Sequence, residues 1–199
     1  MATDATAATC DDEAAALRDH LTSEGRRARI WNTAWAIGFG AAAVGQLALA
    51  WTETQPFGTF DDDDKEQMYV GASKATLGMA ARVILPLRVR VPDATPDACA
   101  DVVALRAAVE EAGRRERRSV ILTLVGGTTV NVAGGLLLWH RRNFETGAIS
   151  FAIGVPFGPL SAFTQPRRSW RMWKEHERAQ TASWTVSVGV RSIWVAGTF

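Results

Sequence analysis

The sequence predicts an all-α integral membrane protein with four transmembrane helices, arranged as a tandem duplication of a polar helix followed by a two-span hairpin. Long uncharged windows, an internal repeat and a one-sided distribution of basic residues predict this class. The windows cover residues 30–52, 119–139 and 146–166. About 20 helical residues cross a hydrocarbon core of about 30 Å, so each window is long enough to span it. A soluble Gly- and Ala-rich core is the alternative, but a soluble helix needs one polar face.

The internal repeat joins two passages of the chain. Residues 16–51 align with residues 104–139 without a gap, and 11 of the 36 positions are identical. Gly25 then matches Gly113, and Trp51 matches Trp139. The following parts align with a smaller offset, which pairs Gly71 with Gly154. A duplicated unit explains this self-similarity.

The first predicted unit is residues 1–92, with a cytoplasmic helix over about 10–28 and spans over about 30–52 and 67–87. Lys74 and Arg82 make the second span the weakest of the four, and an interfacial helix is the alternative. Its pairing with residues 146–166 in the repeat favours spanning. The acidic run at residues 61–64 is expected to be a solvated loop.

The second predicted unit is residues 93–182, with a cytoplasmic helix over about 96–118 and spans over about 119–139 and 146–166. Thr95 is a suitable N-cap and Pro96 suits the first helical position. Val102, Leu105 and Val109 form an apolar stripe at helical spacing. Pro156 and Pro159 predict a bend in the last span. Gly25 and Gly113 allow either a break before the basic clusters or a continuous helix.

The tail, residues 183–199, departs from the helical pattern. Val186, Val188 and Val190 alternate with small or polar residues, which predicts a β-like strand. We expect this strand to pack on its own chain or to pair with the tail of a neighbour.

Basic residues gather on one side of the four predicted spans. Short basic loops stay in the cytoplasm, so both termini are expected on the cytoplasmic side of a bacterial inner membrane. No apolar stretch before Ile30 resembles the core of a signal peptide. The basic residues on this side are Arg26, Arg27, Arg29, Arg82, Arg88, Arg90, Arg114, Arg115, Arg117, Arg118, Arg167, Arg168, Arg171 and Lys174.

The two cysteines, Cys10 and Cys99, stand at nearly equivalent places in the repeat. In a reducing cytoplasm they are expected to be free thiols. If their side faced the periplasm, a disulfide would be expected instead. The sequence leaves both possibilities open.

Three polar residues of different spans fall at one predicted depth. Counted at 1.5 Å per residue from the outer face, Gln46, Lys74 and Asn131 lie roughly 8 to 12 Å deep. We expect Lys74 to donate to Gln46 and Asn131, in a polar cluster that could hold an anion or water. The alternative is that Lys74 reaches the outer headgroups, as Arg82 is expected to reach the inner ones. Gly154 and Gly158 form a predicted helix-packing face.

No nucleophile–base set, phosphate-binding loop, dinucleotide fingerprint or metal-ligand spacing is recognisable in the sequence. We therefore expect no enzyme activity, no cofactor and no metal site. A structural or assembly role in the membrane is expected, and an oligomeric small-solute or ion translocator or channel is the alternative. The expected partners are the lipid bilayer and either further copies of the chain or another membrane protein. The net charge of +1 gives no support for nucleic-acid binding.

Overall fold

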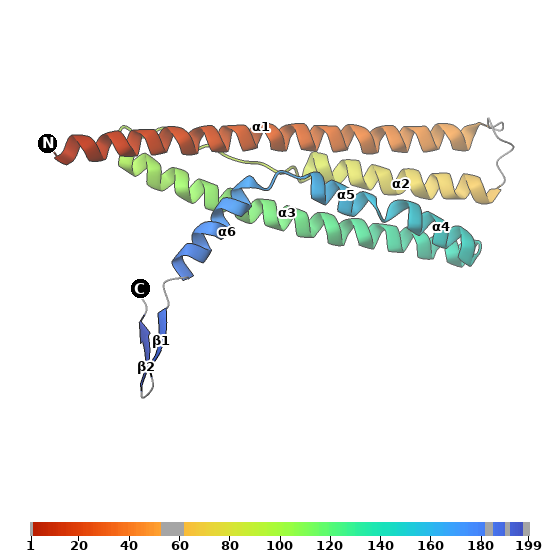
Figure 1. The fold of residues 1–199 in the computed structure, drawn as a ribbon. Helices are drawn as coiled ribbons and strands as arrows, with labels where there is room; N and C mark the ends of the chain where they lie inside the picture. The colour runs from red at the N-terminus through yellow and green to blue at the C-terminus, as the bar shows by residue number, and fades with distance from the viewer. Residues whose placement is uncertain (1, 53–61, 182–184, 190–191, 197–199) are drawn as a thin grey trace.

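The computed structural model describes residues 2–52, 62–181, 185–189 and 192–196. Those residues form six helices and two strands. Two long helices run side by side in the same direction, and three of the shorter helices lie along their C-terminal halves (Figure 1). The elements are α1 (Ala2–Trp51), α2 (Asp62–Ile84), α3 (Ala98–Arg141), α4 (Phe144–Gly154), α5 (Phe157–Thr164), α6 (Arg168–Thr181), β1 (Thr185–Gly189) and β2 (Ser192–Ala196).

Each polar helix is continuous with the apolar helix that follows it. α1 passes through Gly25 and α3 passes through Gly113 without interruption. A mid-helix glycine costs about 1 kcal/mol relative to alanine, which the flanking helix-forming residues tolerate. Gly113 also lets α6 approach closely, since a Cβ built there would lie 3.0 Å from the Ser169 carbonyl oxygen.

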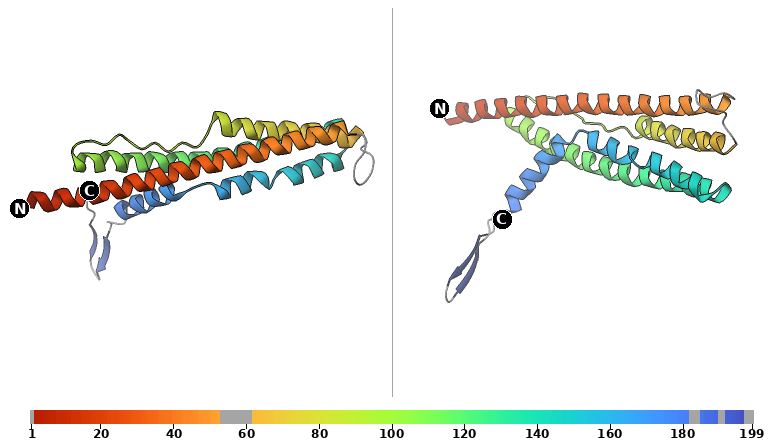
Figure 2. Two further views of the ribbon diagram at one scale, coloured as in Figure 1. Left: turned by 90° about the horizontal axis from the view of Figure 1, so that it is seen from above. Right: turned by 45° about the vertical axis from the view of Figure 1, so that its right-hand side comes forward.

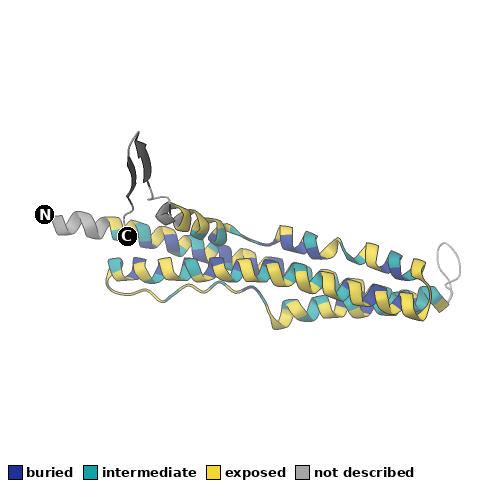
Figure 3. Ribbon diagram, turned by 90° about the horizontal axis from the view of Figure 1, so that it is seen from below, coloured by how far each residue is buried: buried dark blue, intermediate teal, exposed yellow. Residues whose placement is uncertain are grey.

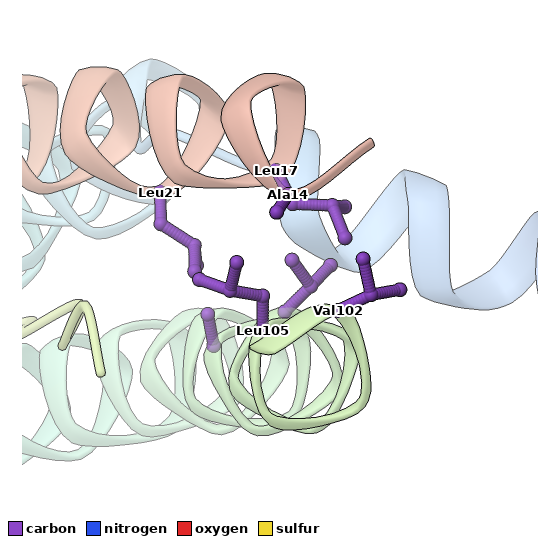
Figure 4. Close-up of a cluster of buried hydrophobic side chains, with 7 residues drawn as sticks. Ala14, Leu17, Leu21, Val102 and Leu105 are labelled. Carbon is purple, nitrogen blue, oxygen red and sulfur yellow. The ribbon is translucent and has the colours of Figure 1, made fainter. Parts of the chain in front are cut away.

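The N-terminal halves of α1 and α3 share an apolar core (Figure 4). Leu17 and Leu21 of α1 meet Val102, Leu105 and further residues of α3, and both Leu21 and Leu105 are fully buried. The predicted apolar stripe is thus confirmed. Burying a leucine side chain contributes roughly 1.5 to 3 kcal/mol, so this contact holds the two helices in register.

Cys10 and Cys99 form a disulfide at the N-terminal ends of α1 and α3. Of the two possibilities that the sequence leaves open, the structure therefore contains the disulfide. The parallel register of the two helices is the reason, because it brings the two Cα atoms to 5.1 Å. Nearby, Arg18 of α1 forms an ion pair with Asp101 of α3 at 2.8 Å.

Three helical segments of the described chain are long and apolar enough to cross a membrane: Thr9–Trp51, Ala98–Arg141 and Phe144–Thr164. Large apolar side chains such as Ile37, Val44 and Val125 are more than half exposed. Exposed positions recur along the helices that carry them (Figure 3). These features indicate an integral membrane protein.

α2, the remaining predicted span, has 23 residues and is long enough, but it is too polar to belong with these three segments. It begins earlier than predicted, because Asp62, Asp63 and Asp64 form its first turn instead of a solvated loop. Carboxylates at that end are favourable, since the helix dipole is positive there. Asp61 lies outside the described residues. The four-span arrangement and the duplication both stay predictions.

The last predicted span is divided into α4 and α5. The helix is interrupted at Val155 and Pro156, as the two prolines predicted. α4 begins at a capped end, where the Asn143 side chain accepts from the Thr146 N–H at 2.8 Å. The second hairpin therefore differs from the first, whose returning helix α2 is unbroken.

α6 was not predicted as a separate element. After Pro166 the chain turns and α6 leaves the bundle at an angle (Figure 2). The tail then forms an antiparallel hairpin, in which Val186 pairs with Val195 and Val188 with Ile193. Val190 lies outside the described residues.

Candidate functional site

Gln46, Lys74 and Asn131 line one cavity of about 820 Å³ between the helices. α1 contributes Gln46, α2 contributes Lys74 and α3 contributes Asn131, while α4 and α5 complete the wall. The three residues that the sequence analysis grouped by depth thus lie around one space. A cavity of this volume has the size of a small-molecule site.

Lys74 does not make the hydrogen bonds that we expected. Its ammonium group donates to Ser150 Oγ at 2.8 Å and to the Ser150 carbonyl oxygen at 3.1 Å. The expected donation to Gln46 and Asn131 is replaced by this contact with α4. Lys74 faces into the bundle because Gly134 of α3 leaves room for its stem, since a Cβ there would lie 2.8 Å from Lys74 Cδ.

Gln46 and Asn131 each place an amide oxygen against a glycine of the neighbouring helix. A Cβ on Gly71 would overlap with Gln46 Oε1, and a Cβ on Gly154 would overlap with Asn131 Oδ1. Asn131 Nδ2 also donates to the Gly127 carbonyl oxygen at 2.9 Å. Gly71 and Gly154 are the residues that the sequence repeat pairs, so both hairpins contain the same type of contact.

Gly158 belongs to the same packing face as Gly154. A Cβ on Gly127 of α3 would lie 3.2 Å from the Gly158 Cα. The two helices therefore pack backbone against backbone at this point, as small residues permit in membranes.

Arg82 is a further cation of the cavity wall. Its guanidinium donates to Thr123 Oγ1 and Ser161 Oγ, each at 3.2 Å. Its Cζ lies 4.2 Å from the centre of the Trp31 ring, which is a cation–π contact. The expectation that Arg82 reaches the inner headgroups is wrong, because hydroxyls and an aromatic ring hold it between the helices.

The cavity wall has positive and no negative side chains. It includes five cations and, among the described residues that line it, no aspartate or glutamate. Most of the remaining wall is apolar or glycine. An anion inside the cavity would therefore meet attraction without competing carboxylates. The five cations are Lys74, Arg82, Arg88, Arg115 and Arg118.

A second cavity, of about 730 Å³, lies between α2 and α3. It opens toward the other polar end, where Asp62, Glu66 and Arg142 line it. Arg142 pairs there with Glu66 at 2.5 Å and with Asp63 at 2.7 Å. Lys74, Leu77 and Val130 line both cavities, so these side chains stand in the wall that the two spaces share.

A separate polar cluster lies where α6 leaves α1 and α3. The Glu116 carboxylate of α3 is fully buried and accepts from the Trp170 N–H at 2.8 Å, which caps the first turn of α6. Burial raises the pKa of Glu116 to about 7, and hydrogen bonds from Trp170 and Ser169 oppose that rise.

Glu24 and His20 of α1 belong to the same cluster. The fully buried Glu24 pairs with Arg27 at 3.3 Å, and His20 Nε2 lies 3.2 Å from Ser169 Oγ. Burial lowers the pKa of His20. This cluster was not predicted from the sequence. Glu116 stands among arginines, and such a charged segment is typical of an exposed surface.

Comparison with protein families, with characterised proteins and with solved structures gives no match for this chain. Within the part of the chain that the structure describes, no group of three or more His, Cys, Asp or Glu side chains could hold a metal ion.

Proposed function

We propose that the chain is a non-enzymatic membrane translocator for an anion, working as a homo-oligomer. The observation that carries this proposal is that Lys74 lines both cavities, which would together form a path along the bundle. One cavity extends to Arg88 and Arg118 at one polar end, and the other extends to Asp62 and Arg142 at the opposite end.

The positive groups stand at successive depths along this path. Arg118 immediately precedes the apolar window of α3, and Thr123, which accepts from Arg82, lies roughly 7 Å further along the helix. Lys74 precedes Arg82 by two turns of α2, roughly 12 Å. An anion would meet a new cation at each step, and neutral hydroxyl and carbonyl partners leave the charges of Lys74 and Arg82 uncompensated.

Anion flux into liposomes tests the proposal. The purified protein is reconstituted with an entrapped halide-quenched dye, and iodide is added outside. We expect iodide to enter faster than in protein-free liposomes. Lys74→Met should lower the rate about tenfold or more, because a unit charge at contact distance in a protein contributes several kcal/mol. Lys174→Met, on an exposed position of α6, is the matched control and should leave the rate unchanged.

Two results would contradict the proposal. One is an iodide rate equal to that of protein-free liposomes, measured with protein that elutes as a single folded species. The other is a Lys74→Met variant with unchanged flux. Potassium flux, followed in parallel, should stay at the protein-free level because the path carries positive charge.

We propose as the second candidate a structural or assembly role. The disulfide and the Arg18–Asp101 ion pair favour it, because they hold the polar halves of α1 and α3 together outside the apolar windows. Val103 is 68% exposed on this part and offers an apolar contact. Cross-linking in native membranes should give a larger adduct that Val103→Asp removes and Arg106→Gln, also exposed there, retains. Wild-type protein that lacks both flux and an adduct would exclude both candidates.

The orientation that we propose places both termini in the cytoplasm of a bacterial inner membrane, on the ground of the one-sided basic residues. The disulfide is on that same side. Disulfides persist in oxidising compartments, so the two observations favour opposite orientations. Labelling of an introduced cysteine distinguishes the two orientations.

A further inference from the structure

Two guanidinium groups that line the first cavity have no counter-ion among the described residues. Arg88 and Arg118 line the cavity, are exposed, and form no ion pair with a described residue. Arg115 lies beside them and pairs with Glu111 at 2.7 Å. Arg118 is the last charge before the uncharged window of α3, so these groups lie at the level of lipid phosphates.

The same cavity is open to the side of the bundle through apolar residues. Leu77, Leu85, Leu122 and Phe157 line it, yet they are between 47% and 72% exposed. Side chains that belong to both the wall and the outer surface form the rim of a lateral opening. In the membrane, acyl chains lie against this rim.

Between the arginines and Lys74, the cavity is lined by residues with small side chains, and some of these side chains are polar. Gly126, Gly127 and Gly158 line it together with Thr123 and Ser161. A hydrated headgroup can therefore enter between the helices, while a chain attached to it passes out between Leu77 and Leu122. A small inorganic anion would make no use of the lateral opening.

We propose that the anion is the headgroup of an anionic phospholipid, with its phosphate between Arg88 and Arg118 and its acyl chains outside the rim. This inference rests on the proposed translocation function and names its substrate class. The charge complementarity supports it, because the cavity wall holds five cations and none of the described carboxylates. Arg82 and Lys74 would then receive the phosphate at deeper levels.

Lipid movement between leaflets tests the inference. Liposomes of phosphatidylcholine contain the reconstituted protein and a trace of fluorescent short-chain phosphatidylglycerol. Albumin added outside extracts this lipid from the outer leaflet only. Albumin is too large to pass an anion pathway, whereas a small reducing anion could enter the liposome and imitate lipid movement. Fluorescent phosphatidylcholine is the zwitterionic comparison.

We expect the protein to make nearly all the fluorescent phosphatidylglycerol extractable, where protein-free liposomes release about the outer half. Arg118→Gln and Arg88→Gln should each lower the rate about fivefold, from the attraction of one basic residue for anionic lipid. Neither side chain has an ion-pair partner among the residues that the structure describes, so folding should be unaffected. Arg117→Gln is the matched control, because Arg117 is exposed and does not line the cavity.

Iodide flux separates the inference from the proposed function. If iodide enters and phosphatidylglycerol stays in its leaflet, the substrate is a small soluble anion and the lipid inference is wrong. If neither moves, the translocation function is wrong as well. Equal rates for phosphatidylglycerol and phosphatidylcholine, or an unchanged rate in both Arg88→Gln and Arg118→Gln, would also overturn the lipid inference.

Discussion

The Lys74 ammonium group on α2 donates to both the hydroxyl and the backbone carbonyl of Ser150 on α4. These acceptors are neutral, so they satisfy the donors of the lysine and leave its charge in place. The contact also joins the first hairpin to the second beside a residue that lines both cavities. Substitutions at this pair therefore affect both packing and the charge of the path.

Ser150→Ala should destabilise the protein. A hydrogen bond to a charged group contributes roughly 1.5 to 3 kcal/mol, and we expect a loss near the lower value because the Ser150 carbonyl still accepts. The midpoint of thermal unfolding in detergent measures the loss. Ser73→Ala is the control, since the exposed Ser73 hydroxyl donates only to the Tyr69 carbonyl of its own helix. Equal midpoints for the two variants would contradict the expectation.

Gly154→Ala should be costly, and more so than Gly71→Ala. In both variants the new Cβ overlaps an amide oxygen. Gln46 can move its longer side chain away from Gly71, whereas the shorter Asn131 is also held by its bond to Gly127. Overpacking of this kind costs roughly 1 to 3 kcal/mol. Gly38→Ala, with no heavy atom within 4 Å of its Cβ, is the control. The midpoint of thermal unfolding should fall most for Gly154→Ala, less for Gly71→Ala and least for Gly38→Ala. A larger fall for Gly71→Ala than for Gly154→Ala would show that the Asn131 side chain moves freely.

Stability should fall as pH rises from about 4.5 to about 7. The pKa of Glu116 is about 7 in the folded protein against an ordinary 4.5, so in this range the unfolded chain holds fewer protons than the folded one. Two to three pKa units correspond to about 3 kcal/mol. Glu116→Gln should remove this dependence, and Glu111→Gln, an exposed control in the same helix, should keep it. The midpoint of unfolding, measured at several pH values between these limits, reports this dependence. If the midpoints of wild type and Glu116→Gln change with pH in parallel, Glu116 is not the cause.

His20 acts in the opposite direction. Its lowered pKa favours the neutral ring in the folded protein, so its contribution to stability is lost as pH falls below about 6.5. The comparison of wild type with Glu116→Gln removes this effect, because both proteins contain His20.

A cysteine introduced at Asp62 should react with a membrane-impermeant maleimide added to intact bacterial cells. Cys10→Ser and Cys99→Ser are combined with Asp62→Cys so that only the new thiol reacts. The opposite basic side then lies in the cytoplasm, as the positive-inside rule requires. Reaction only after the cells are permeabilised would place the disulfide on the outside. A cysteine at Asp19, exposed on the polar half of α1, gives the reciprocal measurement.

Sequence reasoning grouped residues that line one cavity but did not find their partners. Rise per residue fixes position along a helix, and Gln46, Lys74 and Asn131, grouped in that way, do line one cavity. The rotation of each helix about its own axis, and the distance at which two helices pack, depend on glycine contacts such as that of Asn131 with Gly154. Ser150, an unremarkable serine in an apolar window, therefore could not be selected as the partner of Lys74.

Two further features lay beyond the sequence patterns. Lys74 and Arg82 lie on the side of α2 that other helices cover. The average polarity of α2 therefore does not indicate that it packs within the bundle. α6 is capped by Glu116 from more than 50 residues away, and a contact at that separation has no local signal. The cysteine positions did carry information, since their near-equivalence in the repeat was what a disulfide between aligned helices requires.

The disulfide gives α1 and α3 a common pivot. Because each of these helices is continuous and the two are linked near their N-terminal ends, they can separate only by rotating about the link. The separation that results increases toward their C-terminal ends. Gln46 lies 36 residues beyond Cys10, or roughly 54 Å along α1, so a rotation of about 5° would displace it by about 5 Å relative to α3. A displacement of that size is the diameter of a methylene chain. Reduction of one covalent bond near the N-terminus would thus change how wide the distant cavity can open.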